Sequence, residues 1–465
     1  MKYTQFSALA LNGNLIKSIQ SLGYTKLTPI QAETIPEILK GFDVIGQGET
    51  GSGKTAAFSL GLLNKLDTTK FKIQALVLCP TRELADQVAG EIRKLGRMIH
   101  NIKVLTLCGG SPFGPQKGSL SHGAHIVVGT PGRILDHLDK HNLSFDSLDT
   151  LVLDEADRML DMGFQASLDA IIKYLPVDRQ TLLFSATFGD NVSSISAQIM
   201  RKPKIIKVAS VIKEKEVSQN FYLVKDEKSR FDALKLILFS CLPESTIVFC
   251  ETKKEVQAIA DSLINLGLSA SPLHGDLDQK DRDQTLVCFS NKSLSILVAT
   301  DVAARGIDIS SLSAVFNYKL ARDVNSHIHR IGRTGRAGSN GNIYNLYTER
   351  DGHKITLLEK YFDQIIIPKE LPPIRVLLDA PFQSQMKTIQ IDGGKKQKIR
   401  AGDIVGALTS DGTIKATKIG DINIKDNWSY VAIEFDIYRI ALTKLSTEKL
   451  KGKNFRVRLI GDNKK

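Results

Sequence analysis

The residues whose types and spacing most clearly indicate chemistry lie in the segment 48–55, which reads GETGSGKT. It fits the pattern GxxxxGK[ST], follows the apolar stretch FDVIG and precedes the helix-forming stretch AAFSLGLLNKL. In such a context, backbone N–H groups surround phosphates at a helix N-terminus, the lysine meets the β- and γ-phosphates, and the hydroxyl coordinates Mg²⁺. The segment predicts a nucleoside triphosphate site formed by Thr50, Gly51, Ser52, Gly53, Lys54 and Thr55.

A second group of acidic residues follows the apolar stretch LVL, where residues 154–157 read DEAD. Asp154 is expected to hold Mg²⁺, directly or through water, and Glu155 to orient and deprotonate an attacking water. An isolated acidic cluster at the start of a helix is usually only solvated. Its pairing with the segment 48–55 favours the catalytic interpretation, which is hydrolysis of the terminal phosphate.

Further short motifs occur in a fixed order along the chain. They are TPIQ (28–31), PTREL (80–84), GG (109–110), TPGR (130–133), SAT (185–187), QKDR (279–282), ATDVAARGID (299–308) and HRIGRTGR (329–336). With DEAD at 154–157, this set resembles the DEAD-box RNA helicases over roughly residues 6–350. One motif alone would be weak support, but chance does not produce all of them in order. Gly48 departs from the pattern, because the family usually has Ala there, and glycine remains compatible with the loop.

The resemblance implies the remaining contacts to ATP and Mg²⁺. The amide of Gln31 offers both a donor and an acceptor to the adenine edge, which favours ATP over GTP. Phe6 is expected to stack on the adenine ring, Tyr24 to support that segment, and Asp308 to bind the ribose. Arg333 and Arg336 are expected to contact the γ-phosphate as arginine fingers from a second domain. Neither domain then holds a whole active site, so hydrolysis would require closure of a cleft.

The resemblance also implies a track that grips single-stranded RNA by its phosphates and ribose hydroxyls. The implied side chains are Arg82, Arg133 and Arg282, with polar or backbone contacts from Thr81, Gly110, Thr130 and Thr300, and with Ser185, Thr187 and His329 as the relay between phosphate site and RNA site. A single arginine considered alone is more often part of a surface salt bridge. Backbone contacts carry no sequence information, so this track is expected to be indifferent to sequence.

Elements that could position these motifs recur twice along the chain. Apolar runs at 75–79, 125–129, 150–154 and 181–185, and again at 246–250, 296–300 and 314–318, alternate with helical stretches. This alternation predicts parallel sheets covered on both faces. The expected fold class is α/β, with two RecA-like parallel-sheet domains at 1–207 and 217–367 and a small α+β RRM-like domain at 386–465. The charged run KEKE at 213–216 is expected to be a linker.

The last 80 residues, 386–465, have the predicted order β-α-β-β-α-β. They hold 17 Lys and Arg against 9 Asp and Glu, an excess of eight within a chain of net charge +12. The excess favours a polyanionic partner, the alternative being a merely solvated basic surface. The candidate RNA-binding residues are Lys395, Lys396, Lys398, Arg400, Lys453, Arg456 and Arg458. Tyr430 is expected to share a sheet face with Trp428 and stack on bases, the alternative being core packing.

Two segments of this tail, 393–403 and 449–459, resemble the RNA-binding domain of DEAD-box helicases that act in assembly of the large ribosomal subunit. That resemblance implies recognition of a 23S ribosomal RNA hairpin, with pre-50S particles as the partner and no stable protein partner.

The composition, with 42% hydrophobic and 24% charged residues, is typical of a soluble globular protein. The sequence has no apolar run of eighteen residues and no signal-peptide pattern, so we expect a cytoplasmic protein without membrane contact. Five scattered cysteines are interpreted as buried free thiols. Two alternatives remain. The first is an ATP-gated RNA clamp, which is favoured if duplex separation does not depend on ATP. The second is a DNA helicase, which is favoured if DNA stimulates the ATPase as strongly as RNA does.

Overall fold

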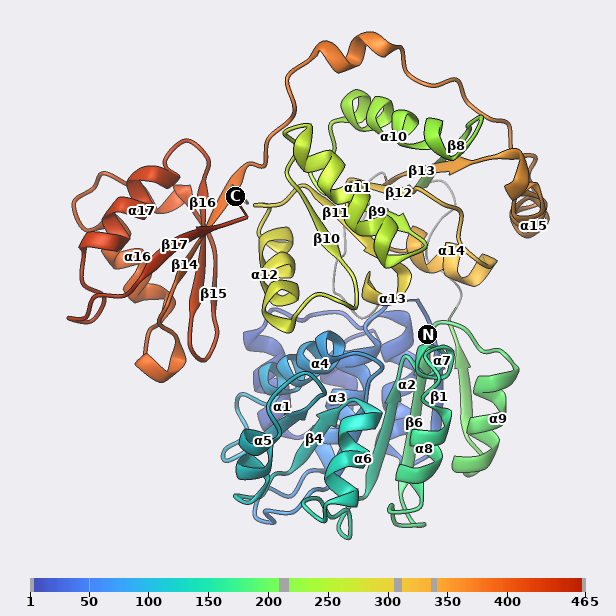
Figure 1. The fold of residues 1–465 in the computed structure, drawn as a ribbon. Coiled ribbons are helices and arrows are strands. Elements are labelled where there is room, and N and C mark those ends of the chain that lie inside the picture. Colours follow the sequence, from blue (N-terminus) through green and yellow to red (C-terminus); the bar gives the residue numbers. More distant parts are fainter. Residues whose placement is uncertain (1–3, 50, 209–216, 305–311, 336–340, 462–465) are drawn as a thin grey trace. The chain divides into compact units, whose positions relative to one another are not determined.

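The computed structural model describes residues 4–49, 51–208, 217–304, 312–335 and 341–461. The chain forms two compact units that divide within residues 209–216, and the linker predicted at 213–216 lies outside the described residues. The first unit contains a seven-stranded sheet, and the second contains a six-stranded sheet and a four-stranded sheet (Figure 1). This organisation confirms the expected fold class of two parallel-sheet domains followed by a small α+β domain.

All seven strands of the first unit are parallel, in the order β3-β4-β2-β5-β6-β1-β7. Their bounds are β1 Val44–Gln47, β2 Ala75–Leu78, β3 Val104–Leu107, β4 Ile126–Gly129, β5 Thr150–Asp154, β6 Gln180–Ser185 and β7 Lys204–Lys207. Successive side chains of a strand face opposite sides, so Leu76 and Leu78 enter one hydrophobic cluster and Val77 enters the other. Burial on both faces explains the continuous apolar runs in the sequence.

Helices cover both faces of this sheet. The face that includes Val77 is covered by α1 Gly13–Ser21, α2 Pro29–Leu39, α3 Lys54–Lys65 and α4 Arg82–Leu95, and the other by α5 Phe113–Leu120, α6 Pro131–Asp139, α7 Ala156–Asp161, α8 Gln165–Ile172 and α9 Asp190–Ile199. In α4, Leu84, Val88 and Ile92 recur at intervals of four and are buried. Thr81 caps this helix by accepting a hydrogen bond from the backbone N–H of Leu84.

The six strands of the second sheet are also parallel, in the order β10-β11-β9-β12-β13-β8. They are β8 Val217–Leu223, β9 Thr246–Cys250, β10 Ala270–Leu273, β11 Ile296–Thr300, β12 Ala314–Asn317 and β13 Gly341–Tyr347. The helices of this domain are α10 Glu227–Cys241, α11 Lys253–Asn265, α12 Gln279–Ser290, α13 Asp301–Ala304, α14 Val324–Ile331 and α15 Gly352–Phe362. The second domain therefore repeats the parallel architecture of the first.

The tail folds in the predicted order β-α-β-β-α-β. It consists of β14 Met386–Ile391, α16 Ala401–Thr409, β15 Ile419–Ile424, β16 Ser429–Glu434, α17 Tyr438–Thr447 and β17 Val457–Ile460. The antiparallel sheet has the order β15-β16-β14-β17. Ile389 and Val431 pack with Leu408 of α16 and Leu445 of α17, so both helices cover one face of the sheet. The other face carries Thr388, Gln390 and Tyr430.

Short 3₁₀ helices complete the described elements: η1 Phe6–Ala8, η3 Glu349–Asp351, η4 Ile374–Leu378, η5 Lys395–Gln397 and η6 Ala416–Lys418. All five cysteines are free thiols, and four of them are buried, whereas Cys241 is partly buried. Within the ranges that the structure describes, no helix combines the length and the apolar character needed to cross a membrane.

Candidate nucleotide site and RNA-binding surfaces

The predicted phosphate-binding segment connects β1 to α3. Gly53 stands at the N-cap of α3 with a φ of 95°, in the left-handed region that favours glycine. A side chain at this position would also collide with Gln31. Lys54 is only 6% exposed, and its Nζ donates a 2.5 Å hydrogen bond to the carbonyl oxygen of Gly48. The lysine therefore lies inside the loop that would surround a triphosphate.

Asp154 and Glu155 lie buried at the carboxyl end of β5. Glu155 has a φ of 52°, which is rare for a residue with a side chain and marks the sharp turn into α7. Burial and then the neighbouring Glu155 raise the pKa of Asp154 to about 7. Burial lowers the pKa of Lys54, although Asp154 and Glu155 favour its charged form. The carboxylate of Asp154 is therefore short of compensating positive charge.

This charge balance fits a Mg²⁺ ion that arrives with a nucleotide. Thr55 lies in the first turn of α3 and Asp154 at the end of β5, and both offer the oxygen donors that Mg²⁺ prefers. Among the described residues, no group of three or more His, Cys, Asp or Glu could hold a metal. Mg²⁺ in phosphoryl-transfer sites uses one or two protein ligands together with waters and phosphate oxygens, so the donor set fits that kind of ion.

The SAT segment connects the phosphate loop with the acidic segment. β6 lies between β1 and β5 in the sheet, and it ends at Ser185. The backbone N–H of Gly48 donates to the carbonyl oxygen of Ser185 at 3.1 Å. Thr187 donates its backbone N–H at 3.0 Å and its hydroxyl at 2.7 Å to Oδ2 of Asp157. These contacts join the three segments, and the relay role of Ser185 and Thr187 stays a prediction.

Gln31, the residue predicted to read the adenine edge, lies beside the phosphate loop. Gln31 accepts a 3.0 Å hydrogen bond from the backbone N–H of Thr28 and donates from Nε2 to the carbonyl oxygen of Gly53 at 3.1 Å. Phe6 is 5% exposed and stacks on Tyr24, with ring centroids 6.3 Å apart. Gln31 thus contacts the phosphate loop, whereas Phe6 and Tyr24 pack on each other in the hydrophobic core of the first unit.

One buried contact of the site escaped the sequence analysis. Nη1 of Arg158 lies 3.1 Å from Oε2 of Glu155, and both side chains are less than 10% exposed. The guanidinium holds the predicted general base near the sheet edge. The only sequence signal was the i,i+3 spacing of an acid and a base at the start of a helix.

The predicted RNA contacts of the first unit gather at one edge of its sheet. β3, β4 and β2 are neighbours, and the loops after their carboxyl ends carry the GG, TPGR and PTREL segments. Thr81 and Thr130 are the N-caps of α4 and α6, and Gly110 has a φ of 75°. The side chains of Arg82 and Arg133 are 23% and 12% exposed. Tertiary structure therefore brings these three separate motifs together.

The second domain positions its own predicted residues at the carboxyl end of the sheet and on two helices. β11 ends at Thr300, Arg282 lies in the first turn of α12, and His329 lies in the last turn of α14. Arg333 follows α14 and is 4% exposed. Thr50, Asp308 and Arg336 lie outside the described residues.

A bidentate ion pair braces this part of the second domain. Nε and Nη2 of Arg330 each lie 2.7 Å from a carboxylate oxygen of Asp301. Nη1 of the same arginine donates to Oδ1 of Asn317 at 2.8 Å. Both charged residues lie within the motifs 299–308 and 329–336, and neither has a role predicted from sequence. They connect the turn after β11 to the helix that precedes Arg333.

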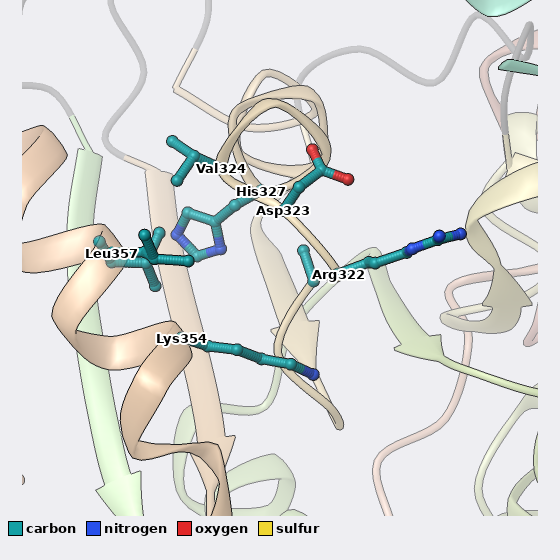
Figure 2. A pocket seen from close by; sticks show the side chains of 8 residues that line it. Arg322, Asp323, Val324, His327, Lys354 and Leu357 are labelled. Carbon is teal, nitrogen blue, oxygen red and sulfur yellow. The ribbon is translucent and has the colours of Figure 1, made fainter.

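A small pocket between α14 and α15 lies outside the predicted site residues. Val324, His327, Lys354 and Leu357 are among the residues that line it (Figure 2). The ring of His327 is 1% exposed, and its Nε2 lies 3.0 Å from Oε1 of Gln219. Burial and then Arg330 lower the pKa of His327 to about 3. The imidazole is therefore neutral and supports the packing of α14.

Most of the predicted basic residues of the tail lie exposed around one end of its sheet. These are Lys395, Lys396, Lys398, Arg400, Lys453 and Arg456. The two segments that carry them meet, because Nζ of Lys451 donates a 2.7 Å hydrogen bond to the carbonyl oxygen of Lys398. Arg458 is partly buried and lies 3.7 Å from Asp392. The six exposed residues form what we call the basic loop cluster.

The assignment of Tyr430 as an RNA-stacking residue is corrected by the structure. Its side chain is 1% exposed, and burial raises its pKa to about 12. The sheet face that carries it packs against α12 and the residues that follow. Oγ1 of Thr388 lies 2.8 Å from Nδ2 of Asn291, and Gln284 donates to Gln390 at 2.8 Å. A ring enclosed between two domains has no face left for a base.

Comparison with protein families divides the chain in the same way. The DEAD/DEAH box helicase family matches residues 28–195, the helicase conserved C-terminal domain matches 229–338, and the DbpA RNA binding domain matches 388–459. The three matches fall on the first domain, the second domain and the tail.

Among curated proteins, the chain is 48% identical to the ATP-dependent RNA helicase DbpA of Escherichia coli, over 98% of this chain and all of that protein. It is 38% identical to DbpA of Bacillus subtilis, over 98% and 99% of the two chains. A solved structure of Saccharomyces cerevisiae Dbp5 bound to RNA and ADP BeF3 superposes with a TM-score of 0.70 at 32% identity, covering 79% of this chain and 95% of that one. The sequence, the two parallel-sheet domains and the tail together place this chain in the DbpA-type DEAD-box family of ATP-dependent RNA helicases.

Proposed function

We propose that this helicase remodels 23S ribosomal RNA during assembly of the large ribosomal subunit in the cytoplasm. In this proposal the tail anchors the enzyme on an RNA hairpin, and the two parallel-sheet domains separate a nearby duplex. The observation that supports it best is the basic loop cluster, because it joins two chain segments into one exposed cationic surface next to a helicase core.

The proposed ATPase step uses groups from both domains. Lys54 holds the β- and γ-phosphates. Thr55 and Asp154 would hold Mg²⁺, which would supply positive charge to the phosphates. Glu155, restrained by Arg158, accepts a proton from the attacking water.

Arg333 and Arg336 come from the second domain and stabilise the charge that develops on the γ-phosphoryl group. Closure of the two domains is therefore required for hydrolysis, and RNA promotes closure by binding both domains at once. Arg82 and Arg133 of the first domain and Arg282 of the second are the proposed contacts to the phosphates of that strand.

The hairpin is proposed to bind at the basic loop cluster and not at the sheet face of the tail. In many RRM domains the sheet face carries aromatic residues that stack on bases. Here that face packs on the second domain through Thr388, Gln390 and Tyr430. Exposed Lys395 and Lys396 remain available for phosphates. Docking of the tail on α12 would connect hairpin binding to the helix that carries Arg282.

The decisive experiment is the RNA-stimulated ATPase of the full chain with intact 23S ribosomal RNA, with fragments of it and with 23S RNA from which single hairpins are deleted. One deletion is expected to raise the RNA concentration for half-maximal activity by at least tenfold, since the loss of a specific anchor leaves only weak backbone contacts. Removal of residues 386–465 should abolish this preference and leave some nonspecific stimulation. Equal stimulation by every RNA would contradict the proposal.

A further inference from the structure

We propose that Phe113 is a positioning residue for Arg133, and that with Gln116 and His137 it makes the GG loop and helix α6 one rigid RNA-binding unit. This inference rests on the proposed function, because it assumes that Arg133 contacts RNA phosphates. None of the three supporting residues belongs to the motifs that identify the family in the sequence.

The ring of Phe113 is enclosed by side chains of α6. It stacks on the imidazole of His137, with centroids 4.2 Å apart and planes at 14°. Nζ of Lys140 also lies over the ring, 4.3 Å from its centroid. The ring of Phe113 therefore contacts one imidazole and two cationic side chains of the same segment, and we infer that its role is to support these neighbours.

Arg133 is the functional neighbour of this ring. Its Cζ lies 5.6 Å from the centroid of Phe113, and its Nη1 donates a 2.9 Å hydrogen bond to the carbonyl oxygen of Ser111. Its Nε lies 3.4 Å from Oδ2 of Asp136. The guanidinium is thus held between the GG loop and its own helix, with the ring of Phe113 restricting its side-chain rotamers.

A buried chain of hydrogen bonds connects the ring to the start of the GG loop. Nε2 of Gln116 donates to the carbonyl oxygen of Cys108 at 3.1 Å, and Oε1 of Gln116 lies 3.3 Å from Nε2 of His137. The amide oxygen can only accept, so Nε2 of His137 carries the proton. His137 is fully buried, and burial and then Arg133 lower its pKa, which keeps the imidazole neutral.

The two loops also contact each other through their backbones. The backbone N–H of Thr130 donates to the carbonyl oxygen of Leu107 at 3.1 Å. Cys108 immediately follows Leu107 and precedes the two glycines. The backbone hydrogen bond, the hydrogen bonds of Gln116 and the stack of Phe113 on His137 therefore form a closed loop of contacts around Arg133. Removal of Phe113 would open that loop beside the guanidinium.

The test uses the full chain and a single-stranded oligoribonucleotide without a hairpin, which reports on the core alone. Phe113→Ala is expected to raise the RNA concentration for half-maximal ATPase activity about five- to tenfold, with the KM for ATP and the maximal rate at saturating RNA unchanged. Phe113→Tyr keeps the stacked ring and should restore the value of the unaltered chain. RNA-free ATPase should be equal in all three.

A double-mutant cycle with Arg133→Ala separates positioning from an independent effect. If Phe113 acts through Arg133, adding Phe113→Ala to Arg133→Ala should change the RNA dependence no further. Additive effects, or a Phe113→Ala protein that binds RNA normally, would overturn the inference. If Arg133→Ala itself leaves RNA dependence unchanged, the proposed RNA contact fails instead. Phe113→Leu, which preserves apolar packing without the stack, replaces Phe113→Ala if circular dichroism shows that the alanine variant does not fold.

Discussion

Thr187 donates both its hydroxyl and its backbone N–H to the same carboxylate oxygen of Asp157, at 2.7 and 3.0 Å. The bond joins the end of β6 to the helix that follows the acidic segment. If Thr187 is the predicted relay between the phosphate site and the segment after β6, these two hydrogen bonds are the contacts that carry it.

Thr187→Ala should uncouple ATP hydrolysis from strand separation. It removes a hydrogen bond to a charged group, a net loss of about 1.5–3 kcal/mol, and leaves the backbone N–H in place. We expect unwinding of a short duplex to fall at least tenfold, with a smaller loss of RNA-stimulated ATPase. Thr187→Ser keeps the hydroxyl and serves as the control. Equal losses of both activities would show that Thr187 does not act as a relay.

Glu155→Gln should retain ATP binding and lose turnover. The amide has nearly the same shape as the carboxylate but cannot accept a proton, and general-base catalysis contributes about 10²–10⁴ in rate. Fluorescent-nucleotide binding and a steady-state ATPase assay together measure the two effects. Hydrolysis within a few-fold of the unaltered enzyme would refute the assignment of Glu155 as the base.

Changing Lys395 and Lys396 together to Ala should flatten the salt dependence of RNA binding. Each neutralised phosphate contributes about 0.7–0.9 to the slope of log K against log salt, so the slope should fall by about 1.5. Titrations at four salt concentrations provide the measurement. Lys228 and Lys254, exposed residues of the second domain outside its motifs, provide a charge-matched control pair. An unaltered slope would exclude the lysines of η5 as phosphate contacts.

Thr388→Val should weaken the docking of the tail on the second domain. The hydroxyl bridges Asn291 and Ser293 at 2.8 Å each, and its loss leaves the buried amide of Asn291 without this partner. Such a loss costs about 1–3 kcal/mol. Hydrogen exchange should become faster in α12 and β14, whereas Thr388→Ser should behave like the unaltered chain. Unchanged exchange would mean that these bonds do not hold the interface.

His327 should make the second domain less stable as pH falls. Its pKa of about 3 in the folded chain lies below the ordinary value of about 6.5, so the unfolded chain takes up the proton first. The contribution of His327 to the free energy of unfolding is complete above pH 6.5 and is lost progressively as the pH falls towards 3. When the pH falls from 7 to 5, the free energy of unfolding should decrease in the unaltered chain by about 2 kcal/mol more than in His327→Gln. Parallel pH profiles from denaturant unfolding would contradict the burial argument.

The sequence by itself determined the parts whose signal is local. The spacing of residues 48–55 after an apolar strand located the phosphate loop, and the alternation of short apolar runs with helical stretches predicted two parallel sheets. The sequence also predicted the order of helices and strands in residues 386–465. Such signals depend on neighbouring residues along the chain, because phosphate loops, strand periodicity and helix caps are set by local backbone geometry.

Only the tertiary structure decided which distant side chains meet. The period of a strand predicts that Tyr430 alternates with its neighbours, but not that its face packs against α12. The stack of Phe113 on His137 joins segments that β4 separates along the chain. These contacts are long-range packing choices, and no local propensity encodes them.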